Sequence, residues 1–345
     1  MGGGVIGLAL AWELRGRGAT VLVVEKGELG REASWAAGGM LAWCDPHLQV
    51  AARGLAWLSQ QLYGEFIESL QEASGRDVDV RRVGTLVLDE GPPGGFDEDY
   101  RAILPSELTQ LEPELRPSSN VQLWPEWSVD PRGLVTALIA ACAARGVDVT
   151  TGHPGFRIAV SGGRAVGVET ASETLAGGAV VNCAGAWAAE IVSGLRTCAT
   201  PTRPVKGQML ALRPAREVLR HVVRAPGIYL IPRGDGRIVV GATVEEAGFD
   251  TVTQPAAIAR LLEVAVALLP ALGSAPVQET WAGLRPGSPD GLPILGETAL
   301  SGYFVASGHF RDGILLAPAT ARVVGGMVLG DKVDGFEALS PQRFG

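Results

Sequence analysis

The 345-residue chain has few charged residues (19%), few aromatic residues (6%) and only four histidines. Lysine and arginine total 29 against 37 aspartates and glutamates, which leaves a formal net charge of −8. Because nucleic-acid binding depends on a basic surface, this balance excludes nucleic acid as an expected partner. The balance says little about a small anionic substrate, since one buried arginine can dominate the field around it.

Cysteine is also scarce, and none of the four has C-x-x-C spacing or a metal-ligand pattern: Cys44, Cys142, Cys183 and Cys198. We therefore expect reduced thiols that pack as small apolar side chains, a cytoplasmic location and no metal site. No signal peptide is expected, because the N-terminus lacks a charged segment followed by an apolar run. Charged residues interrupt the longest apolar stretches, 256–272 and 314–329, which argues against a membrane partner.

The chain does have a glycine-rich loop at its start, Gly2-Gly3-Gly4-Val5-Ile6-Gly7, with G-x-G-x-x-G spacing. A helical pattern follows from Val5 to Arg17, and a valine-rich strand over 21–24 ends in Glu25. In a dinucleotide site, such glycines let the backbone approach a pyrophosphate, and the acid binds a ribose hydroxyl. The pattern predicts a dinucleotide site, although chance glycine-rich starts also occur. Its members would be Gly2, Gly4, Val5, Ile6, Gly7 and Glu25.

A strand normally leads into such a loop, and here only Met1 precedes it. We therefore expect the first β-strand of the nucleotide-binding sheet to be missing. A late start codon or a trimmed sequence would explain this. If the strand is truly absent, the affinity for a cofactor comes into doubt.

Periodicity predicts helices over 50–72, 131–146, 255–269 and 314–329, and a further helix that begins near Ala186. The apolar face of the first is expected to consist of Leu55, Leu58, Leu62, Phe66 and Leu70. Strands are expected over 83–88, 147–151, 179–182, 208–212, 228–231, 238–240 and 303–306, with one more through Thr280. A hairpin is expected from 157–160 and 165–169, joined at Gly162-Gly163.

The order of these elements predicts an α/β fold with two domains. Strand–helix units at the start, middle and end indicate a Rossmann-like domain assembled from discontinuous segments: 1–45, 132–200 and 288–337. The intervening segments, 46–131 and 201–287, are expected to form a mostly antiparallel α+β substrate domain. The discontinuity favours a flavoprotein, because NAD dehydrogenases usually complete both mononucleotide halves consecutively.

Three further blocks are informative: 31–40, with Ser34 and Gly38-Gly39-Met40; 281–293, which contains Arg285; and 307–318, which contains Arg311. Together with the first loop they resemble the FAD-dependent D-amino acid oxidase family, and within it the glycine oxidases of the thiamine-biosynthesis type. The resemblance covers essentially the whole chain apart from the absent strand. The two late blocks are far more specific than the loop alone.

The resemblance implies oxidative deamination of glycine or another small amine or amino acid. The hydride leaves the α-carbon for flavin N5, and O2 reoxidises the flavin to give H2O2. No enzymic base is needed, so the shortage of histidine is no objection. FAD is expected to be non-covalent, because Ile314-Leu315-Leu316 stands where related sarcosine oxidases carry an attaching cysteine. The partners are then a small amino acid and O2, and a homo-oligomer stays open.

A substrate carboxylate in a dry pocket must be paired, and the planar fork of arginine suits that task. By resemblance, Arg285 binds the carboxylate, the hydroxyl of Tyr229 assists it, and Arg311 flanks the same pocket. Each has a structural alternative. Arg285 could form a surface ion pair, Tyr229 could belong to the core, and Arg311 could serve a hydrogen-bond network between domains.

The other cofactor contacts are expected from four segments. Gly38, Gly39 and Met40 would line the flavin ring, Arg31 and Ser34 would lie near the phosphates, and Lys26 would also contact the cofactor. Ala184 and Gly185 would make contact through their backbone. The turn before the last helix would direct helical amides at the pyrimidine edge, where negative charge collects on reduction. Its members are Gly308, His309, Phe310, Arg311, Asp312, Gly313 and Ile314. Arg31 could instead be solvated, 182–185 could be an ordinary tight turn, and His309 is expected to position backbone or pack on a ring.

Two other functions remain open. One is a D-amino acid or sarcosine oxidase, or a dehydrogenase that passes electrons to an acceptor other than O2. The other is a truncated flavin- or NAD-binding protein without turnover, which the absent first strand would favour. The sequence does not decide among the substrates, because selectivity depends on the pocket walls.

Overall fold

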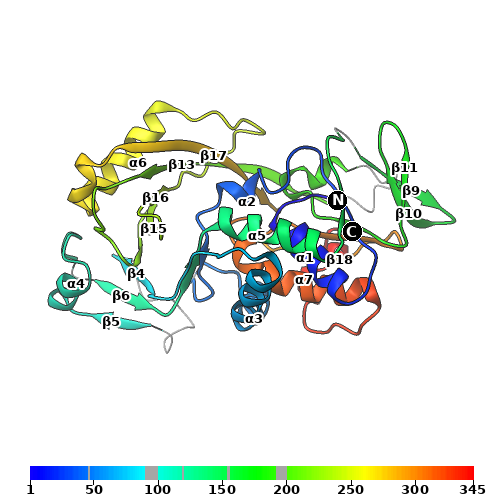
Figure 1. Ribbon diagram of the computed structural model, residues 1–345, viewed down its shortest axis with the longest axis horizontal. Coiled ribbons are helices and arrows are strands. Elements are labelled where there is room, and N and C mark those ends of the chain that lie inside the picture. The colour runs from blue at the N-terminus through cyan, green and yellow to red at the C-terminus, as the bar shows by residue number, and fades with distance from the viewer. Residues whose placement is uncertain (46, 90–99, 119, 154–155, 192–199) are drawn as a thin grey trace.

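The computed structural model describes residues 1–45, 47–89, 100–118, 120–153, 156–191 and 200–345, so Cys198 lies outside the described residues. The molecule is elongated, with a helix-rich half and a half built on a large sheet (Figure 1). Within the described residues, no helix is both long and apolar enough to cross a membrane. The mixed α/β fold expected from the sequence is confirmed.

The helix-rich half is organised around α1 (Val5–Gly16), which packs on α5 (Pro131–Ala144) and α7 (Gly313–Leu329). Two small sheets accompany these helices. In one, β1 (Leu22–Val24) pairs in parallel with β8 (Asp148–Thr150). In the other, β12 (Val180–Asn182) pairs in parallel with β19 (Tyr303–Ser307), which pairs antiparallel with β18 (Ile294–Glu297). Segments from the start, middle and end of the chain therefore build one core.

Met1 and Gly2 connect the two small sheets. The N-terminal amine of Met1 donates to the carbonyl of Val181 at 2.8 Å, and the carbonyl of Met1 accepts from the amide of Cys183 at 2.8 Å. The amide of Gly2 donates to the carbonyl of Val24 at 2.8 Å. These two residues thus hydrogen-bond to both flanking strands at the place where the missing strand is expected. The absence of that strand stays a prediction.

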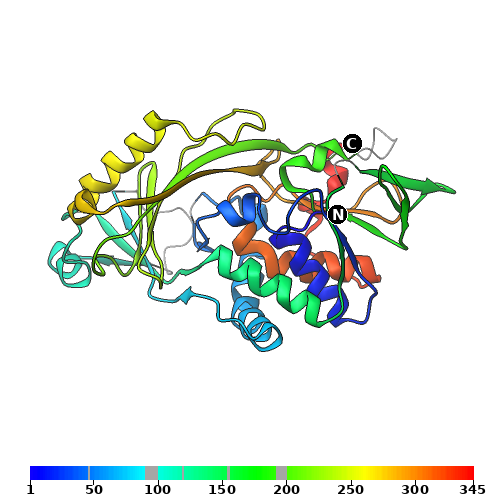
Figure 2. The same ribbon diagram turned by 45° about the horizontal axis from the view of Figure 1, so that its top comes forward.

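The other half contains an eight-stranded sheet in which all pairs are antiparallel except β14–β4. Helix α6 (Pro255–Leu268) lies along one face and contacts β13, β15 and β16 (Figure 2). In spatial order the strands are β17 (Val277–Gly287), β13 (Arg203–Leu212), β16 (Ile238–Gly241), β15 (Ile228–Pro232), β14 (Val222–Ala225), β4 (Thr85–Leu88), β6 (Val121–Trp124) and β5 (Arg101–Ile103). The sheet and α6 enclose a second apolar core.

Smaller elements complete the fold. The predicted hairpin is confirmed as β9 (Arg157–Ser161) and β10 (Arg164–Glu169), with β11 (Thr174–Ala176) beside β10. Strands β2 (Met40–Leu41), β7 (Trp127–Val129) and β3 (Val80–Arg81) form a third small sheet. Short helices are α2 (Ala33–Ala36), α4 (Pro105–Leu111) and 3₁₀ turns at Gly185–Glu190, Pro270–Ser274, Glu337–Leu339 and Pro341–Phe344. The helix expected near Ala186 is thus a 3₁₀ helix, a correction to the sequence analysis.

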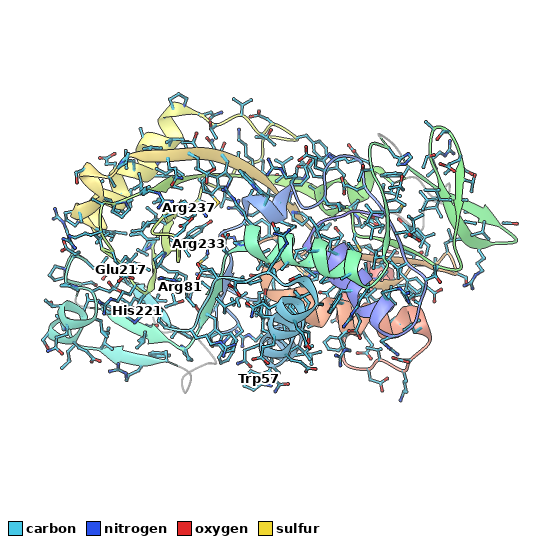
Figure 3. The ribbon with its side chains drawn as sticks, viewed as in Figure 1. Trp57, Arg81, Glu217, His221, Arg233 and Arg237 are labelled. Carbon is cyan, nitrogen blue, oxygen red and sulfur yellow. The ribbon has the colours of Figure 1, made fainter. Side chains whose placement is uncertain are left out.

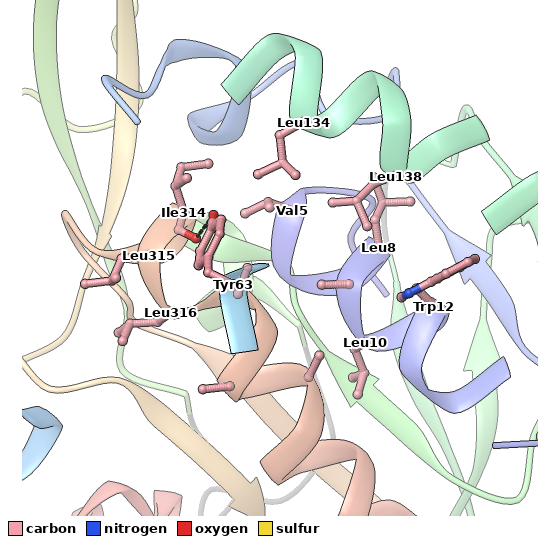
Figure 4. Close-up of a cluster of buried hydrophobic side chains, with 14 of the residues drawn as sticks. Val5, Leu8, Leu10, Trp12, Tyr63, Leu134, Leu138, Ile314, Leu315 and Leu316 are labelled. Carbon is pink, nitrogen blue, oxygen red and sulfur yellow. Dashed lines mark hydrogen bonds between the residues drawn. The ribbon is translucent and has the colours of Figure 1, made fainter. Parts of the chain in front are cut away.

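The buried face of α3 (Val50–Ser74) also differs from the prediction. Leu58, Leu62 and Phe66 are only half-buried, whereas Ser59 and Tyr63 are buried completely. The hydroxyl of Tyr63 donates to the carbonyl of Ile314 at 2.9 Å (Figure 4), and the hydroxyl of Ser59 donates to the carbonyl of Leu315.

Pro318 in α7 explains why the hydroxyl of Tyr63 is buried against this helix. In a helix the carbonyl of Ile314 would accept from the amide of residue 318, and Pro318 has no amide proton. Tyr63 supplies the missing donor. An apolar periodicity does not reveal such a polar position, because it counts only hydrophobic side chains.

The packing of α3 bears on the division into domains. Helix α3 lies in the range 46–131, which the sequence analysis assigns to the substrate domain, yet it packs on α5 and α7. Its buried residues belong to the core of the helix-rich half. We propose two domains that follow the two cores, with α3 on the side of α1, α5 and α7.

Tyr63→Phe is expected to lower the free energy of unfolding by about 1–3 kcal/mol, because the buried carbonyl of Ile314 loses its donor. Urea unfolding followed by circular dichroism measures this change. Tyr100→Phe is the control, since the Tyr100 hydroxyl makes no hydrogen bond with a residue that the structure describes. Equal stabilities of the two variants would contradict the role of Tyr63.

Candidate active site

A cavity of about 790 Å³ is lined by residues of both halves of the molecule. It extends from the glycine-rich loop before α1 to the face of the eight-stranded sheet. Its lining contains every predicted site residue except Gly7 and Gly308: Gly2, Gly4, Val5, Ile6, Glu25, Lys26, Arg31, Ser34, Gly38, Gly39, Met40, Ala184, Gly185, Tyr229, Arg285, His309, Phe310, Arg311, Asp312, Gly313 and Ile314. The chain thus brings together residues from Gly2 near its start to Ile314 near its end.

The glycine-rich loop needs its glycines for close packing. A Cβ on Gly7 would overlap the carbonyl of Gly2, so Gly7 lets α1 approach the start of the chain even though it does not line the cavity. Gly2 has φ 95°, and a Cβ there would overlap the carbonyl of Cys183. Backbone therefore borders this end of the cavity at close range, as a pyrophosphate cradle requires.

Glu25 is buried at this end, with 7% of its surface exposed. Its Oε2 accepts from the amide of Gly3 at 2.7 Å, and its Oε1 accepts from the amide of Gly27 at 2.9 Å. Two backbone donors thus fix the carboxylate, and each oxygen keeps a further lone pair. The position suits the binding of ribose hydroxyls.

The three polar residues expected near the cofactor have different surroundings. The hydroxyl of Ser34 accepts from the amide of Val5 at 2.9 Å, so it caps the first turn of α1. The Nζ of Lys26 lies 3.2 Å from the ring centroid of Trp187 and 3.6 Å from Glu32. Arg31 is 57% exposed and pairs only loosely with Glu28, which agrees with the solvated alternative.

Arg233 holds the segment 38–40 in place, and the sequence analysis missed it. Its guanidinium donates to the carbonyl of Val129 at 2.9 Å and to the carbonyl of Gly38, where the two halves meet (Figure 3). Burial lowers the pKa of Arg233 to about 10. A Cβ on Gly39 would overlap the Val129 carbonyl, so this loop also depends on glycine.

The opposite end of the cavity is formed by Arg285 on β17 and Tyr229 on β15. Nη1 of Arg285 donates to the carbonyls of Lys206 at 3.3 Å and Thr243 at 3.1 Å, and the Tyr229 hydroxyl lies near the same guanidinium. The Tyr229 hydroxyl also donates to Sδ of Met209 at 3.6 Å. The structure brings Tyr229 and Arg285 together, as the resemblance implies.

Arg285 has no carboxylate partner within 4.0 Å among the described residues. Burial lowers its pKa, and the nearby cation Arg311 adds to that effect, while Tyr229 opposes it. Burial likewise raises the pKa of Tyr229, and Arg285 opposes the rise. Nε and Nη2 of Arg285 remain available to an anion, because the two backbone carbonyls engage only Nη1.

The turn before α7 lies between these two ends. Gly308 and Phe310 have φ values of 75° and 48°, and the amide of Phe310 donates to the carbonyl of Pro286 at 2.9 Å. His309 is buried, and its Nε2 lies 3.1 Å from the hydroxyl of Thr320. Burial lowers the pKa of His309 to about 3, so the ring is neutral near pH 7. A positioning role for His309 stays a prediction.

A charged cluster that the sequence analysis missed lies beside this turn. Arg224 on β14 pairs with Asp45 at 2.8 Å and with Glu126 at 3.2 Å, and Asp45, Arg224 and Asp312 all line the cavity. Burial raises the pKa of Glu126. Burial, together with the charge of Asp45, also raises the pKa of Asp312 to about 7, against the opposing charges of Arg311 and Arg224. Asp312 belongs to the predicted turn, but no sequence motif marks Asp45, Glu126 or Arg224, because three separate segments contribute them.

The fold and the cavity define a class: a flavin-type oxidoreductase with a dinucleotide cradle at one end and a cationic pocket at the other. The FAD dependent oxidoreductase family matches residues 1–327. The chain belongs to this family, and its cofactor is FAD.

Individual relatives narrow the comparison. The chain is 36% identical to the bifunctional protein ThiO/ThiG of Synechocystis sp., with 100% of this chain but only 53% of that relative covered. It is 35% identical to the glycine oxidase of Pseudomonas putida, over 96% of this chain and 93% of that one. The crystal structure of glycine oxidase from Geobacillus kaustophilus superposes with a TM-score of 0.90 at 32% identity, over 98% and 96% of the two chains.

Glu25→Ala is expected to weaken FAD binding by about tenfold or more, because a hydrogen bond to a charged acceptor is lost together with the anchor of Gly3. Equilibrium dialysis of FAD against the apoprotein measures the dissociation constant. Glu68→Ala, at an exposed position on α3, is the control. Unchanged FAD affinity would mean that the ribose is held elsewhere.

Asp312→Asn tests the raised pKa of Asp312. Between pH 4 and pH 7 the folded protein keeps a proton that the unfolded chain has lost, so ionisation of Asp312 lowers the free energy of unfolding as pH rises through this range. The variant cannot ionise there. We expect its stability relative to wild type to be greater at pH 8 than at pH 4, as measured by urea unfolding. The same relative stability at both pH values would contradict the burial of this carboxyl group.

Proposed function

We propose that the protein oxidises glycine, or another small amine or amino acid, with FAD as cofactor. The observation that carries the proposal is Arg285, a cation in the cavity without a carboxylate partner among the described residues. A substrate carboxylate would supply the missing counter-charge. The names of the glycine oxidase relatives support the same substrate class.

The residues of the chain would position the substrate for this reaction. Nε and Nη2 of Arg285 would bind the carboxylate through two parallel hydrogen bonds, with the Tyr229 hydroxyl beside them. FAD, when bound, accepts the hydride that leaves the α-carbon. Fixed orientation in a water-poor site provides most of the rate gain in such a reaction, and no base is required from the protein.

The amine must be neutral when its α-carbon loses hydride. The cationic surroundings of Arg285 and Arg311 favour the neutral form over the ammonium ion. The imine product then hydrolyses in water to the oxo acid and ammonia, and O2 accepts the two electrons to give H2O2.

Sarcosine, D-alanine and D-proline are the competing substrates, and a dehydrogenase would use an acceptor other than O2. Steady-state kinetics with glycine and these three amines, with O2 and with a dye as acceptor, separate the possibilities. We expect glycine and O2 to give the highest kcat/KM. A dye-dependent rate that O2 does not support would instead identify a dehydrogenase.

We also propose that the protein works in the cytoplasm. Cys142 and Cys183 are buried free thiols. Burial raises the pKa of Cys142 to about 12 and that of Cys183 to about 11, so both stay protonated. Unpaired thiols are typical of proteins in a reducing compartment.

Arg285→Ala is expected to lower kcat/KM for glycine by about a hundredfold or more, because two charge-assisted hydrogen bonds are lost, each worth roughly 1.5–3 kcal/mol. Oxygen uptake with glycine measures the effect, and the FAD content of the variant is determined first. Arg216→Ala, at an exposed position, is the control. Kinetics close to wild type would remove Arg285 from the substrate site.

A further inference from the structure

Arg285 and Tyr229 lie on strands that are not neighbours. The sheet runs β17, β13, β16, β15, so β13 and β16 separate the strand of Arg285 from the strand of Tyr229. Each side chain nevertheless reaches over the strand beside its own, Arg285 to the carbonyl of Thr243 and Tyr229 to Sδ of Met209. Arg285 therefore crosses β13, and Tyr229 crosses β16. The room for each crossing depends on the side chain that the crossed strand presents on the same face of the sheet.

Arg285 crosses β13 at Gly207. Arg285 pairs with Val205, and Gly207 lies two residues further along β13 on the same face of the sheet. A Cβ on Gly207 would lie 2.5 Å from Cζ of Arg285 and even closer to both Nη atoms. Only a glycine leaves room for the guanidinium to pass over β13 and reach the carbonyl of Thr243.

Tyr229 crosses β16 at Gly241 in the same way. The two residues are direct cross-strand partners, and a Cβ on Gly241 would lie 2.6 Å from both Cζ and Oη of Tyr229. The ring therefore lies flat over β16. Its hydroxyl reaches Met209, which is the partner of Gly241 on β13.

Glycine within a strand weakens the strand and often marks a close approach. Gly207 does not have a positive φ, so its backbone would accept alanine. The conflict with a larger residue at Gly207 lies in the side-chain space alone.

We propose that Gly207 and Gly241 are positioning residues of the active site. Because they have no side chains, they leave the space through which Arg285 and Tyr229 pass over β13 and β16. They thereby set where the substrate carboxylate binds. This inference rests on the proposed function, because it assigns the carboxylate to Arg285.

Gly207→Ala in the FAD-loaded protein tests the inference, with acetate as the probe. Acetate carries the carboxylate of glycine but cannot be oxidised, and changes in the flavin absorbance report its binding. We expect the dissociation constant of acetate and the KM for glycine to rise by about tenfold or more, because the guanidinium is displaced from its bonds. FAD affinity is expected to stay at the wild-type value. Wild-type acetate binding in Gly207→Ala would overturn the proposal.

A double-mutant cycle with Arg285→Ala separates positioning from a general structural effect. If Gly207 acts through Arg285, adding Gly207→Ala to Arg285→Ala causes no further loss of acetate binding. The double variant should also melt at a higher temperature than Gly207→Ala alone, because removal of the guanidinium relieves the overlap. This comparison applies even if the single variant folds poorly. A further, additive loss, or a double variant as unstable as the single one, would contradict the proposal.

Two more variants complete the test. Gly64→Ala on α3 is the control, since a Cβ there would meet no atom within 4 Å, and it should bind acetate as wild type does. Gly241→Ala should weaken acetate binding in wild type but should cause no further loss when it is added to Tyr229→Ala, which removes the ring that a Cβ at 241 would meet. Equal losses in both backgrounds would remove Gly241 from the proposal. If wild type itself fails to bind acetate, the proposed function falls, whereas normal binding by both wild type and Gly207→Ala overturns only the positioning role.

Discussion

The active site depends on Arg285, a guanidinium that has no carboxylate within 4.0 Å among the residues that the structure describes. Two backbone carbonyls hold it and fix its direction without neutralising its charge. A charge kept in a partly dry cavity is costly until an anion arrives, so the folded protein is prepared to bind a carboxylate. The arrangement requires close approach of backbone and side chain, and glycines at 207 and 241 permit it.

Hydrogen bonds connect the cofactor end of the cavity to its substrate end. The amide of Phe310 donates to the carbonyl of Pro286, the residue that follows Arg285, so the turn before α7 is anchored to the arginine's strand. Arg233 anchors the segment 38–40 from the other side. These contacts hold the two segments that would bind the flavin ring near the sheet face that carries Arg285. The orientation that amine oxidation requires therefore follows from the packing of two cores rather than from one loop.

The sequence allowed good predictions of the α/β fold, the family and the main helices, because glycine spacing and apolar periodicity are local signals. It also pointed to the residues that line the cavity. Tyr63 escaped prediction, since its hydroxyl replaces the missing amide of Pro318 on a distant helix. Ser59 escaped because its hydroxyl bonds the Leu315 carbonyl and the Ala319 amide of that same helix. The cluster around Arg224 and the positions of Gly207 and Gly241 escaped for a related reason. Their roles depend on strand order and register, which no local sequence pattern specifies.

An anaerobic titration of the FAD-loaded protein with glycine, followed by visible absorbance, tests the central claim most directly. It needs neither O2 nor a dye, so it isolates carboxylate binding and transfer of the hydride from all later steps. The account predicts that the flavin band bleaches at glycine concentrations that saturate the Arg285 site, and that Arg285→Ala requires far more glycine. A flavin band that persists at every glycine concentration would contradict the account.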